Sequence, residues 1–379
     1  QSFQADFKHF EKSNRLWLDD FAEFMAIKEH FGNQALQKWD DKKAVARDPS
    51  ALEKYRTMLA EQIQYFKVTQ YFFFKQWTEL KNYANQKGIQ IIGDMPIYVA
   101  ADSVEVWTKP ELFQLDEERN PLFVAGVPAD QFSATGQLWG NPLYAWEEHK
   151  KQGYAWWIHR IEESFKIYDV LRIDHFKGFS DYWQVDGKAE VAKDGSWQPG
   201  PGYDLFKAVK EQLGDLPIIA EDLGNIDDKA RKLLTDCNYP GMKILQFGFE
   251  DVSGESLDSP HYCIPHSIVY TGTHDNDVTN GWYNSLTEQQ QQYINDYTHR
   301  HEDESICQAM IRQLFATVSN TAIATMQDVL DLPASSRMNV PSTIGGNWQW
   351  RMQQSDLTQD KKDFLEKMTT LYQRANQEK

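Results

Sequence analysis

Six short apolar runs constrain the fold of this chain more than any other feature of its sequence. Each run is followed by a turn rich in Gly, Asp and Pro and then by a helical pattern, and the runs span residues 89–99, 167–176, 216–224, 241–249, 267–277 and 321–330. Strands that alternate with helices form parallel sheets with crossover connections, and continuous apolar runs suit strands that are buried on both faces. The sequence therefore predicts an α/β fold whose chemistry lies at the carboxyl ends of its strands.

The segment before the first run has a different pattern. Apolar positions recur at intervals of three and four in residues 17–31 and 55–84, which predicts helices. We expect residues 1–87 to form a helical segment and residues 88–379 to carry the strands and further helices, in one catalytic domain overall. Residues 102–150, rich in Pro, Gly and aromatic side chains, are expected to form a loop insertion that binds substrate.

Length, charge and cysteine content exclude several classes of protein. A chain of 379 residues is long enough for one large α/β barrel or for two domains. A formal net charge of −17 offers no basic surface for phosphate backbones, so nucleic acid is a poor candidate partner. No apolar stretch approaches the length of a membrane span, and three scattered cysteines fit neither a disulfide framework nor a metal cluster. We expect a reducing, cytoplasmic setting without a membrane partner; the sequence predicts no oligomeric state.

Aromatic side chains are abundant, at 13% of the chain. Many of them stand beside Gly, Asn and Asp rather than inside apolar runs, where their rings could stack on the apolar faces of sugars. Any single ring is more often part of a core or an interface than of a sugar site. Abundance alone therefore favours a carbohydrate ligand only weakly.

Acidic residues recur just beyond the predicted strands. Within four of the runs an acid comes directly after the apolar part: Asp94 follows IQIIG, Asp174 follows DVLRI, Glu221 follows LPIIA and Asp275 follows IVYTGTH. An Asp at such a place can also stabilise a turn or begin a helix, so each acid alone has an ordinary structural explanation. Four in succession favour a catalytic edge of the sheet.

The residues around these acids suggest separate roles for them. Arg172 lies two positions before Asp174, on the same face of a strand, and its guanidinium would keep that carboxylate ionised, as a nucleophile requires. Glu221 follows an apolar strand, where partial burial would favour the protonated form needed by a proton donor; Asp222 is a rival whose side chain should point to the opposite face. Asp275 would be a third acid, which binds sugar hydroxyls. Such a set is typical of glycoside chemistry.

Other chemistries lack their motifs. No Gly-rich phosphate loop, HExxH pair or G-x-S-x-G elbow occurs in the sequence. We therefore expect no cofactor and no metal.

Seven segments together resemble the 4-α-glucanotransferase family, also called amylomaltase or disproportionating enzyme. They are GDMPIYVA, GVPADQFSATGQLWGNPLYAW, YDVLRIDHFKGF, LPIIAEDLG, GMKILQFGF, VYTGTHDND and MNVPSTIGGNWQWR, in that order along nearly the whole chain. The resemblance implies a (β/α)8 barrel of the TIM type, related to the α-amylases. It also implies a retaining reaction that moves α-1,4-glucan segments from maltooligosaccharides, starch or glycogen-derived glucans to the 4-hydroxyl of an acceptor glucan.

The resemblance also implies roles for particular residues. Asp174 would be the nucleophile, Glu221 the acid/base and Asp275 the residue that stabilises the transition state. The residues expected to bind substrate are Arg172, His274, Asp94, Gln137, Trp139, Phe247, Asp251 and Asn339.

Two departures from the family pattern stand out. Lys177 occupies a position where the family commonly has Arg, which keeps the charge but loses bidentate geometry, so we expect no catalytic role for it. The family's opening strands and a Ser/Tyr-rich loop should also precede residue 1. We therefore expect this chain to be a fragment whose barrel lacks its first two strands.

Two other functions remain possible from the sequence. A related α-glucan hydrolase would use the same acids and deliver water instead of an acceptor sugar. An inactive glycan-binding fragment would keep the groove without turnover.

Overall fold

The structure, a computed structural model, describes residues 3–129, 135–224 and 226–375. Residues 130–134 of the predicted loop insertion lie outside the described part. The chain divides into two compact units. Unit 1 comprises Gln1–Glu221 and Asn225–Tyr239, and unit 2 comprises Asp222–Gly224 and Pro240–Lys379. The single catalytic domain expected from the sequence stays a prediction.

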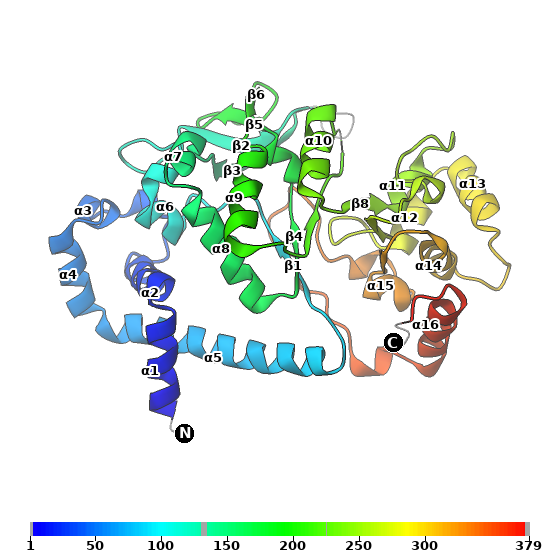
Figure 1. Cartoon of the computed structure of the whole chain (residues 1–379), viewed down its shortest axis with the longest axis horizontal. Helices are drawn as coiled ribbons and strands as arrows, with labels where there is room; N and C mark the ends of the chain where they lie inside the picture. The colour runs from blue at the N-terminus through cyan, green and yellow to red at the C-terminus, as the bar shows by residue number, and fades with distance from the viewer. Residues whose placement is uncertain (1–2, 130–134, 225, 376–379) are drawn as a thin grey trace. The chain divides into compact units, whose positions relative to one another are not determined.

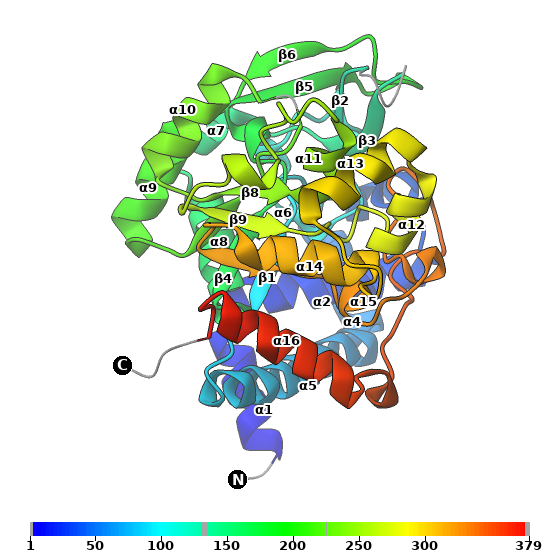
Figure 2. The ribbon, with the colours of Figure 1, turned by 90° about the vertical axis from the view of Figure 1, so that its right-hand side faces the viewer.

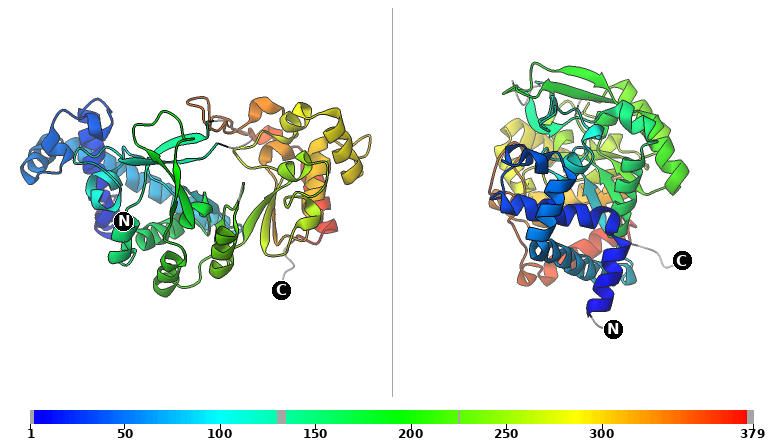
Figure 3. Two further views of the ribbon diagram at one scale, coloured as in Figure 1. Left: turned by 90° about the horizontal axis from the view of Figure 1, so that it is seen from above. Right: turned by 90° about the vertical axis from the view of Figure 1, so that its left-hand side faces the viewer.

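Helices joined by turns make up the first part of unit 1. They are α1 (Phe3–Ser13), α2 (Arg15–His30), α3 (Lys42–Val45), α4 (Pro49–Met58) and α5 (Ala60–Gln86). Local chemistry defines where two of them begin, because the side chains of Asp41 and Asp48 accept hydrogen bonds from the first backbone N–H groups of α3 and α4. Helices α1 and α2, drawn in dark blue in Figure 3, pack against the long helix α5.

A parallel sheet forms the centre of unit 1. Its strand order is β1 (Ile92–Met95), β4 (Val170–Ile173) and β7 (Ile218–Ala220). Helix α8 (Ala155–Ile167) contacts β1 and β4, and α9 (Tyr203–Leu213) packs between α8 and α10 (Asp228–Cys237), as Figure 1 shows. All three strands fall within apolar runs predicted from the sequence.

A second sheet in unit 1 was not predicted. Its four antiparallel strands, in the order β3-β2-β5-β6, are β2 (Phe123–Val127), β3 (Gln137–Pro142), β5 (Asp181–Asp186) and β6 (Ser196–Pro199). Two of them lie in the expected loop insertion, which also contains α6 (Val104–Thr108) and α7 (Trp146–Lys151). Strands β3, β5 and β6 contain Gly, Pro or polar residues in place of a continuous apolar run, and β2 (FVAGV) is a short apolar stretch followed by another strand instead of a helix, so the alternation of apolar runs and helices does not reveal them.

Unit 2 has its own parallel sheet, in the order β10-β9-β8. The strands are β8 (Gly241–Ile244), β9 (Ser267–Tyr270) and β10 (Thr321–Ile323), again within predicted runs. Helix α14 (Ile306–Ala316) packs along this sheet, as Figure 2 shows. The other helices are α11 (Leu245–Glu250), α12 (Thr279–Ser285), α13 (Glu288–Thr298), α15 (Met326–Val329) and α16 (Gln359–Leu371). The predicted strand over 241–249 was too long, because its second half forms α11.

Short 3-10 turns complete the secondary structure. They are η1 (Leu36–Lys38), η2 (Pro110–Leu112), η3 (Phe176–Phe179), η4 (Pro260–Tyr262), η5 (Ala334–Ser336) and η6 (Gln354–Asp356). Within the described ranges, none of the helices combines the length and the apolar character that crossing a bilayer requires.

Each unit has a separate apolar core. The core of unit 1 is rich in aromatic rings and includes the fully buried Trp39, Trp107 and Trp157. The core of unit 2 joins α11 to the sheet and α14 through Phe249, Val269 and residues such as Met310. Many of the abundant aromatic residues are therefore structural, while Trp139 and Trp348 keep 36% and 61% of their surface exposed.

Candidate active site

Two of the predicted acids in unit 1 share one guanidinium. Arg172 on β4 is paired in register with Asp94 on β1. Its Nη1 lies 2.7 Å from both carboxylate oxygens of Asp94 and 3.1 Å from Oδ1 of Asp174. Burial lowers the pKa of Arg172, but the charges of Asp94 and Asp174 outweigh it and hold that pKa above its ordinary value. The register of the two strands thus fixes a cation between two carboxylates.

Glu221 lies one strand further along the same sheet. Ile173 and Ala220 are paired in register, so Asp174 and Glu221 are the first residues beyond the paired ends of β4 and β7. The backbone N–H of Glu221 donates to the carbonyl oxygen of Ile173 over 3.0 Å. Adjacent strands are about 4.8 Å apart, which places the two acids as neighbours at the carboxyl edge of the sheet.

His175, which the sequence does not single out, connects Glu221 to the loop insertion. Its backbone N–H donates to Oε2 of Glu221 over 2.8 Å, which favours the ionised carboxylate and opposes the effect expected from burial. The backbone of His175 has a φ of 51°, uncommon for a residue other than glycine. This turn aims the N–H at the neighbouring strand. The motif RIDHF contains the residue, but nothing in its spacing reveals the backbone contact.

The His175 ring contacts Trp139, a predicted substrate-binding residue. The two ring centroids are 4.8 Å apart in an edge-to-face arrangement. Trp139 lies on β3, and its indole N–H donates to Oε1 of Gln137 over 3.3 Å. Burial, followed by the charge of Lys177, lowers the pKa of His175 to about 4, so the ring is neutral at neutral pH. A chain of contacts therefore runs from Gln137 to the predicted acids.

The predicted acid in unit 2, Asp275, is held by hydrogen bonds from a later segment of the chain. Asp275 lies in the loop after β9, and its Oδ1 accepts a hydrogen bond of 2.6 Å from the side-chain amide of Asn339. The guanidinium of Arg337 donates to the backbone carbonyl of Asp275 over 2.6 Å. Nε2 of His274 lies 3.3 Å from Oδ2 of Asp275. The structure thus brings three predicted residues together and adds Arg337, which the sequence-based analysis missed.

Two weaker predictions lie on or after helix α11. Phe247 is part of that helix, and Asp251 directly follows it. The carboxylate of Asp251 accepts hydrogen bonds from the hydroxyl and the backbone N–H of Ser253, and these bonds lower the pKa of Asp251. Asp251 therefore stabilises a local turn, and a part in substrate binding stays a prediction for both residues.

Lys177 and Asp222 have structural partners. Nζ of Lys177 lies 2.7 Å from the carboxylate of Asp227, the N-cap residue of α10, and 4.8 Å from the ring centroid of Trp197. The side chain of Asp222 accepts a hydrogen bond of 2.7 Å from the backbone N–H of Met242, and burial raises the pKa of Asp222. The side chains of Lys177 and Asp222 therefore each have a structural role.

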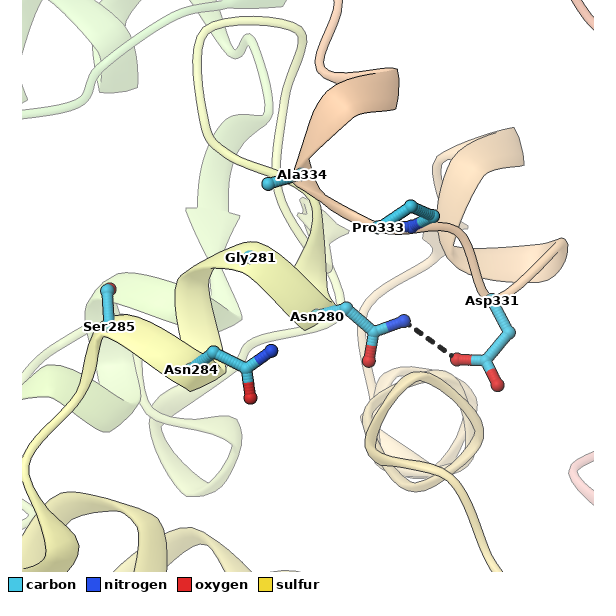
Figure 4. Close-up of a pocket in the computed structure, with 7 residues that line it drawn as sticks. All are labelled: Asn280, Gly281, Asn284, Ser285, Asp331, Pro333 and Ala334. Atoms are coloured by element: carbon cyan, nitrogen blue, oxygen red, sulfur yellow. Dashed lines mark hydrogen bonds between the residues drawn. The ribbon is translucent and has the colours of Figure 1, made fainter.

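Two pockets lie within unit 2. The pocket beside His274 has a volume of about 200 Å³, and its wall includes Asn276, Gln327 and Trp348. The other has about 550 Å³ and contains none of the predicted residues. Figure 4 shows it between α12, which carries Asn280 and Asn284, and the segment from Asp331 to Ala334. There the Asn280 amide donates to Asp331 over 3.0 Å.

Potential metal ligands are sparse in the described residues. One group of three, His159, Glu162 and Glu163 on α8, brings its ligand atoms within 4.8 Å of one another. Lys166 already pairs with Glu163 there. The absence of a metal from the reaction stays a prediction.

Comparison with known proteins assigns the family. Residues 1–358 match the model of a family described as 4-alpha-glucanotransferase. A 4-alpha-glucanotransferase of Streptococcus pneumoniae is 52% identical over 373 residues, which cover 98% of this chain and 74% of the relative. A 4-alpha-glucanotransferase of Clostridium butyricum is 42% identical, over 97% of this chain and 76% of the relative's length.

Solved structures agree with this match. An amylomaltase from Streptococcus agalactiae, solved in complex with acarbose, is 59% identical and superposes with a TM-score of 0.96 over 98% of this chain and 74% of its own. An amylomaltase from Corynebacterium glutamicum is only 16% identical and shows a similar fold, with a TM-score of 0.70 over 91% of this chain and 52% of its own. The α/β fold with acids at the strand ends and these matches lead to one conclusion: the chain belongs to the 4-alpha-glucanotransferase family of transferases.

Proposed function

We propose that the chain is a retaining 4-α-glucanotransferase that moves segments of α-1,4-glucans to the 4-hydroxyl of an acceptor glucan or of glucose. The observation that carries this proposal is the Asp94–Arg172–Asp174 cluster on neighbouring strands, with Glu221 on the next strand. Family membership supports the substrate class, since the matching relatives are 4-alpha-glucanotransferases.

The proposed first step forms a covalent intermediate. A carboxylate oxygen of Asp174 attacks the anomeric carbon, the bond from that carbon to the glycosidic oxygen breaks, and Glu221 gives its proton to the leaving oxygen. In the second step Glu221 takes a proton from the acceptor 4-hydroxyl, whose oxygen displaces Asp174 from the anomeric carbon. Two inversions give net retention.

The spacing of the strands supports retention. Retaining enzymes keep their two carboxyl groups about 5–5.5 Å apart, whereas inverting enzymes need about 6.5–9.5 Å to admit a water. Asp174 and Glu221 follow adjacent paired strands, whose axes are about 4.8 Å apart. The shorter separation suits direct attack by Asp174.

The protonation of the two acids would be set by different neighbours. Arg172 places its guanidinium 3.1 Å from the carboxylate of Asp174, the proposed nucleophile. In the free protein the backbone N–H of His175 favours the ionised form of Glu221. We propose that bound glucan, by excluding water, restores the protonated form that donates to the leaving oxygen.

The other predicted residues would bind and orient the glucan. We assign Asp275 to the stabilisation of positive charge in the transition state, and Arg172, Asp94 and His274 to the sugar at the cleavage point. Trp139 and Gln137 would cover the bound glucan, with weaker parts for Asn339, Phe247 and Asp251. Trp139 suits this role because its ring is partly exposed and rests on a neutral His175.

We also propose a (β/α)8 barrel of the TIM type and a cytoplasmic setting. Strand order supports the barrel, because consecutive parallel strands are neighbours in both parallel sheets. Free cysteines support a reducing setting, since Cys237, Cys263 and Cys307 form no disulfide.

Incubation with maltotriose tests the proposed reaction. The chain should produce both shorter and longer maltooligosaccharides, and Asp174→Asn should lower kcat by at least about 10⁴-fold, because the amide cannot form the covalent intermediate. A matched control is Asp204→Asn, which removes an exposed surface acid paired with Lys150 and should leave turnover within twofold.

Each product pattern decides between the alternatives. A ladder of longer sugars means transfer. Accumulation of glucose and maltose alone would mean hydrolysis, and an unchanged maltotriose pool with measurable binding would mean a glycan-binding fragment. Full activity of Asp174→Asn would remove this residue as the nucleophile.

A further inference from the structure

One segment of unit 2 holds Asp275 at its start and reaches His274 at its end. It runs from Arg337 to Trp348 and is called the clamp segment here. Arg337 and Asn339 donate to the backbone and to the side chain of Asp275. Trp348 lies with its ring centroid 5.0 Å from that of His274. The clamp segment therefore contacts two neighbouring residues of the candidate site from both of its ends.

Hydrogen bonds within the clamp segment fix the position of Trp348. The backbone N–H of Trp348 donates to the carbonyl oxygen of Met338 over 2.7 Å, which closes the segment into a loop. Inside the loop, Oδ1 of Asn347 accepts from the backbone N–H of Val340 over 3.0 Å, and its amide donates to the hydroxyl of Thr343 over 3.0 Å. An indole held by a closed loop loses little conformational freedom when a ligand binds.

The backbone at Trp348 is held in a conformation that bulky residues seldom adopt. Its φ is 60°, and Gly345 and Gly346 before it also have positive φ values. The ring nevertheless keeps 61% of its surface in solvent. A left-handed conformation at a large aromatic residue costs free energy, and burial of the ring in the core does not repay that cost. Such local strain together with an exposed ring points to a binding role.

The pocket beside the exposed ring combines apolar side chains with a few polar groups. It has a volume of about 200 Å³, and its wall includes Trp348, His274, Asn276 and Met338. At about 30 Å³ for each water, this volume corresponds to about seven waters, the scale of one sugar ring. Oδ1 of Asn276 is occupied by Thr273, but its amide nitrogen and the indole N–H of Trp348 have no partner among the described residues. Both can donate to hydroxyl groups.

We propose that Trp348 is the platform of a binding site for one glucose ring of the glucan, with the ring stacked on the indole beside His274. An aromatic face suits the apolar C–H face of a pyranose, and the amide of Asn276 suits its hydroxyl groups. The site deepens the proposed function and rests on it. Trp348 contacts substrate in this role.

A purely structural role explains the geometry less well. An aromatic residue needed only to support His274 would be expected to bury most of its ring, as Trp39 and Trp157 do in unit 1. Ile344, at the tip of the same loop, is fully exposed and lines neither pocket, so exposure in the clamp segment is not by itself a sign of binding. It therefore provides a matched control.

Binding of maltotriose by isothermal titration tests the platform. Every variant is measured in the Asp174→Asn background, so that the sugar is not consumed. Trp348→Ala should weaken binding by about tenfold or more, whereas Trp348→Phe, which keeps a flat ring, should stay within about threefold. Ile344→Ala should match the parent. In the active chain, Trp348→Ala should raise KM for maltotriose by about tenfold while kcat changes less than threefold.

The outcomes separate this inference from the proposed function. Wild-type chain that makes no longer maltooligosaccharides overturns the function and the inference together. Transfer by the wild type with unchanged binding and KM in Trp348→Ala overturns the platform alone. Equal losses in the Phe and Ala variants, or a fall confined to kcat, would show that Trp348 only supports His274 and would also overturn the platform.

Discussion

The acids of the two units are held by different kinds of partner. In unit 1, Asp94 and Asp174 share the guanidinium of Arg172, which is carried by the central strand of the sheet. In unit 2, Asp275 lies beyond the end of β9 and depends on an amide and a guanidinium from the clamp segment, 64 and 62 residues further along the chain. The carboxylates of Asp174 and Asp275 are similarly exposed, at 41% and 44%. The difference therefore lies in their partners and not in burial.

This difference suits the chemistry proposed for each acid. A full positive charge on the neighbouring residue keeps a nucleophile ionised, and a strand holds it rigidly. A neutral amide orients Asp275 without cancelling its charge, which leaves that charge available to a positively charged transition state. A loop can also adjust as the sugar distorts. Unit 1 thus holds its acids by charge pairing on a strand, and unit 2 holds Asp275 by hydrogen bonds in a loop.

The largest expected effect comes from removing the shared cation. Arg172→Met leaves two carboxylates close together without the charge that separates them, so we expect kcat/KM to fall by at least about 10³-fold. Breaking a buried ion pair costs about 3–5 kcal/mol, and since both carboxylates are 41% exposed, solvent should reduce the loss to about 2–4 kcal/mol. Urea unfolding and maltotriose kinetics measure the two losses.

Arg172→Lys is the matched control for this prediction. It keeps the charge but not the planar fork, so its stability should lie between those of the wild type and Arg172→Met. Unfolding free energies for Arg172→Met within 1 kcal/mol of the wild type would contradict the idea that unit 1 depends on charge pairing.

A smaller expected effect is a pH dependence of the unfolding free energy that originates in unit 1. In unit 1 the side chain of His149 is buried, at 1% exposure, and its Nε2 lies 3.1 Å from the carbonyl oxygen of Leu112. Burial lowers the pKa of His149 from 6.5 to about 4. Between these values the unfolded chain binds a proton that the folded chain does not, so stability falls as pH falls. We expect a loss of about 2 kcal/mol between pH 7 and pH 5 from this group.

His149→Gln isolates that contribution, because glutamine can still donate to Leu112 but does not titrate. The loss of unfolding free energy between pH 7 and pH 5 should shrink by about 2 kcal/mol in the variant. His301→Gln, an exposed position in unit 2, should leave the loss unchanged. An equal pH dependence in wild type and His149→Gln would refute the assignment.

The parallel strands could be predicted from the sequence because local signals define them. Runs such as LPIIA are apolar and bounded by turns, and the acid that follows each run was found by the same signal. The antiparallel strands could not be found in this way, since β3 contains Gly140 and Pro142 and β6 ends at Pro199. Their pairing depends on partners elsewhere in the chain.

The candidate site was predictable only where its contacts are local. Arg172 and Asp174 are two residues apart on one strand, and the expectation that Arg172 contacts Asp174 is confirmed. The backbone N–H of His175 and the guanidinium of Arg337 were missed, because each acts across the fold on a residue 46 or 62 positions away. Side-chain identity does not indicate which backbone group will donate.

A further expected effect concerns the amide that holds Asp275. Asn339→Ala removes the hydrogen bond of 2.6 Å to Oδ1 and leaves the carboxylate free to turn away, so we expect kcat to fall by about 10- to 100-fold. Asn339→Asp should fall further, because it removes the donor and places a second negative charge beside Asp275. Asn284→Ala, which truncates an exposed asparagine on α12, should keep at least half of the wild-type kcat.

The order of the two Asn339 variants decides what the amide does. If the Asn339 amide only fills space, both substitutions should have small effects, and kcat for maltotriose should be within about twofold of the wild type in each variant. If it orients a charge, aspartate should be the worse variant, and higher ionic strength should weaken the added repulsion and narrow the gap between the two. Higher ionic strength should have the opposite effect in unit 1, because there it screens an attraction, the one between Arg172 and the carboxylates of Asp94 and Asp174. Measuring kcat of Asn339→Asp and of the wild type over a range of salt concentrations therefore separates two effects. One is the repulsion that the variant introduces in unit 2, and the other is the attraction that is already present in unit 1.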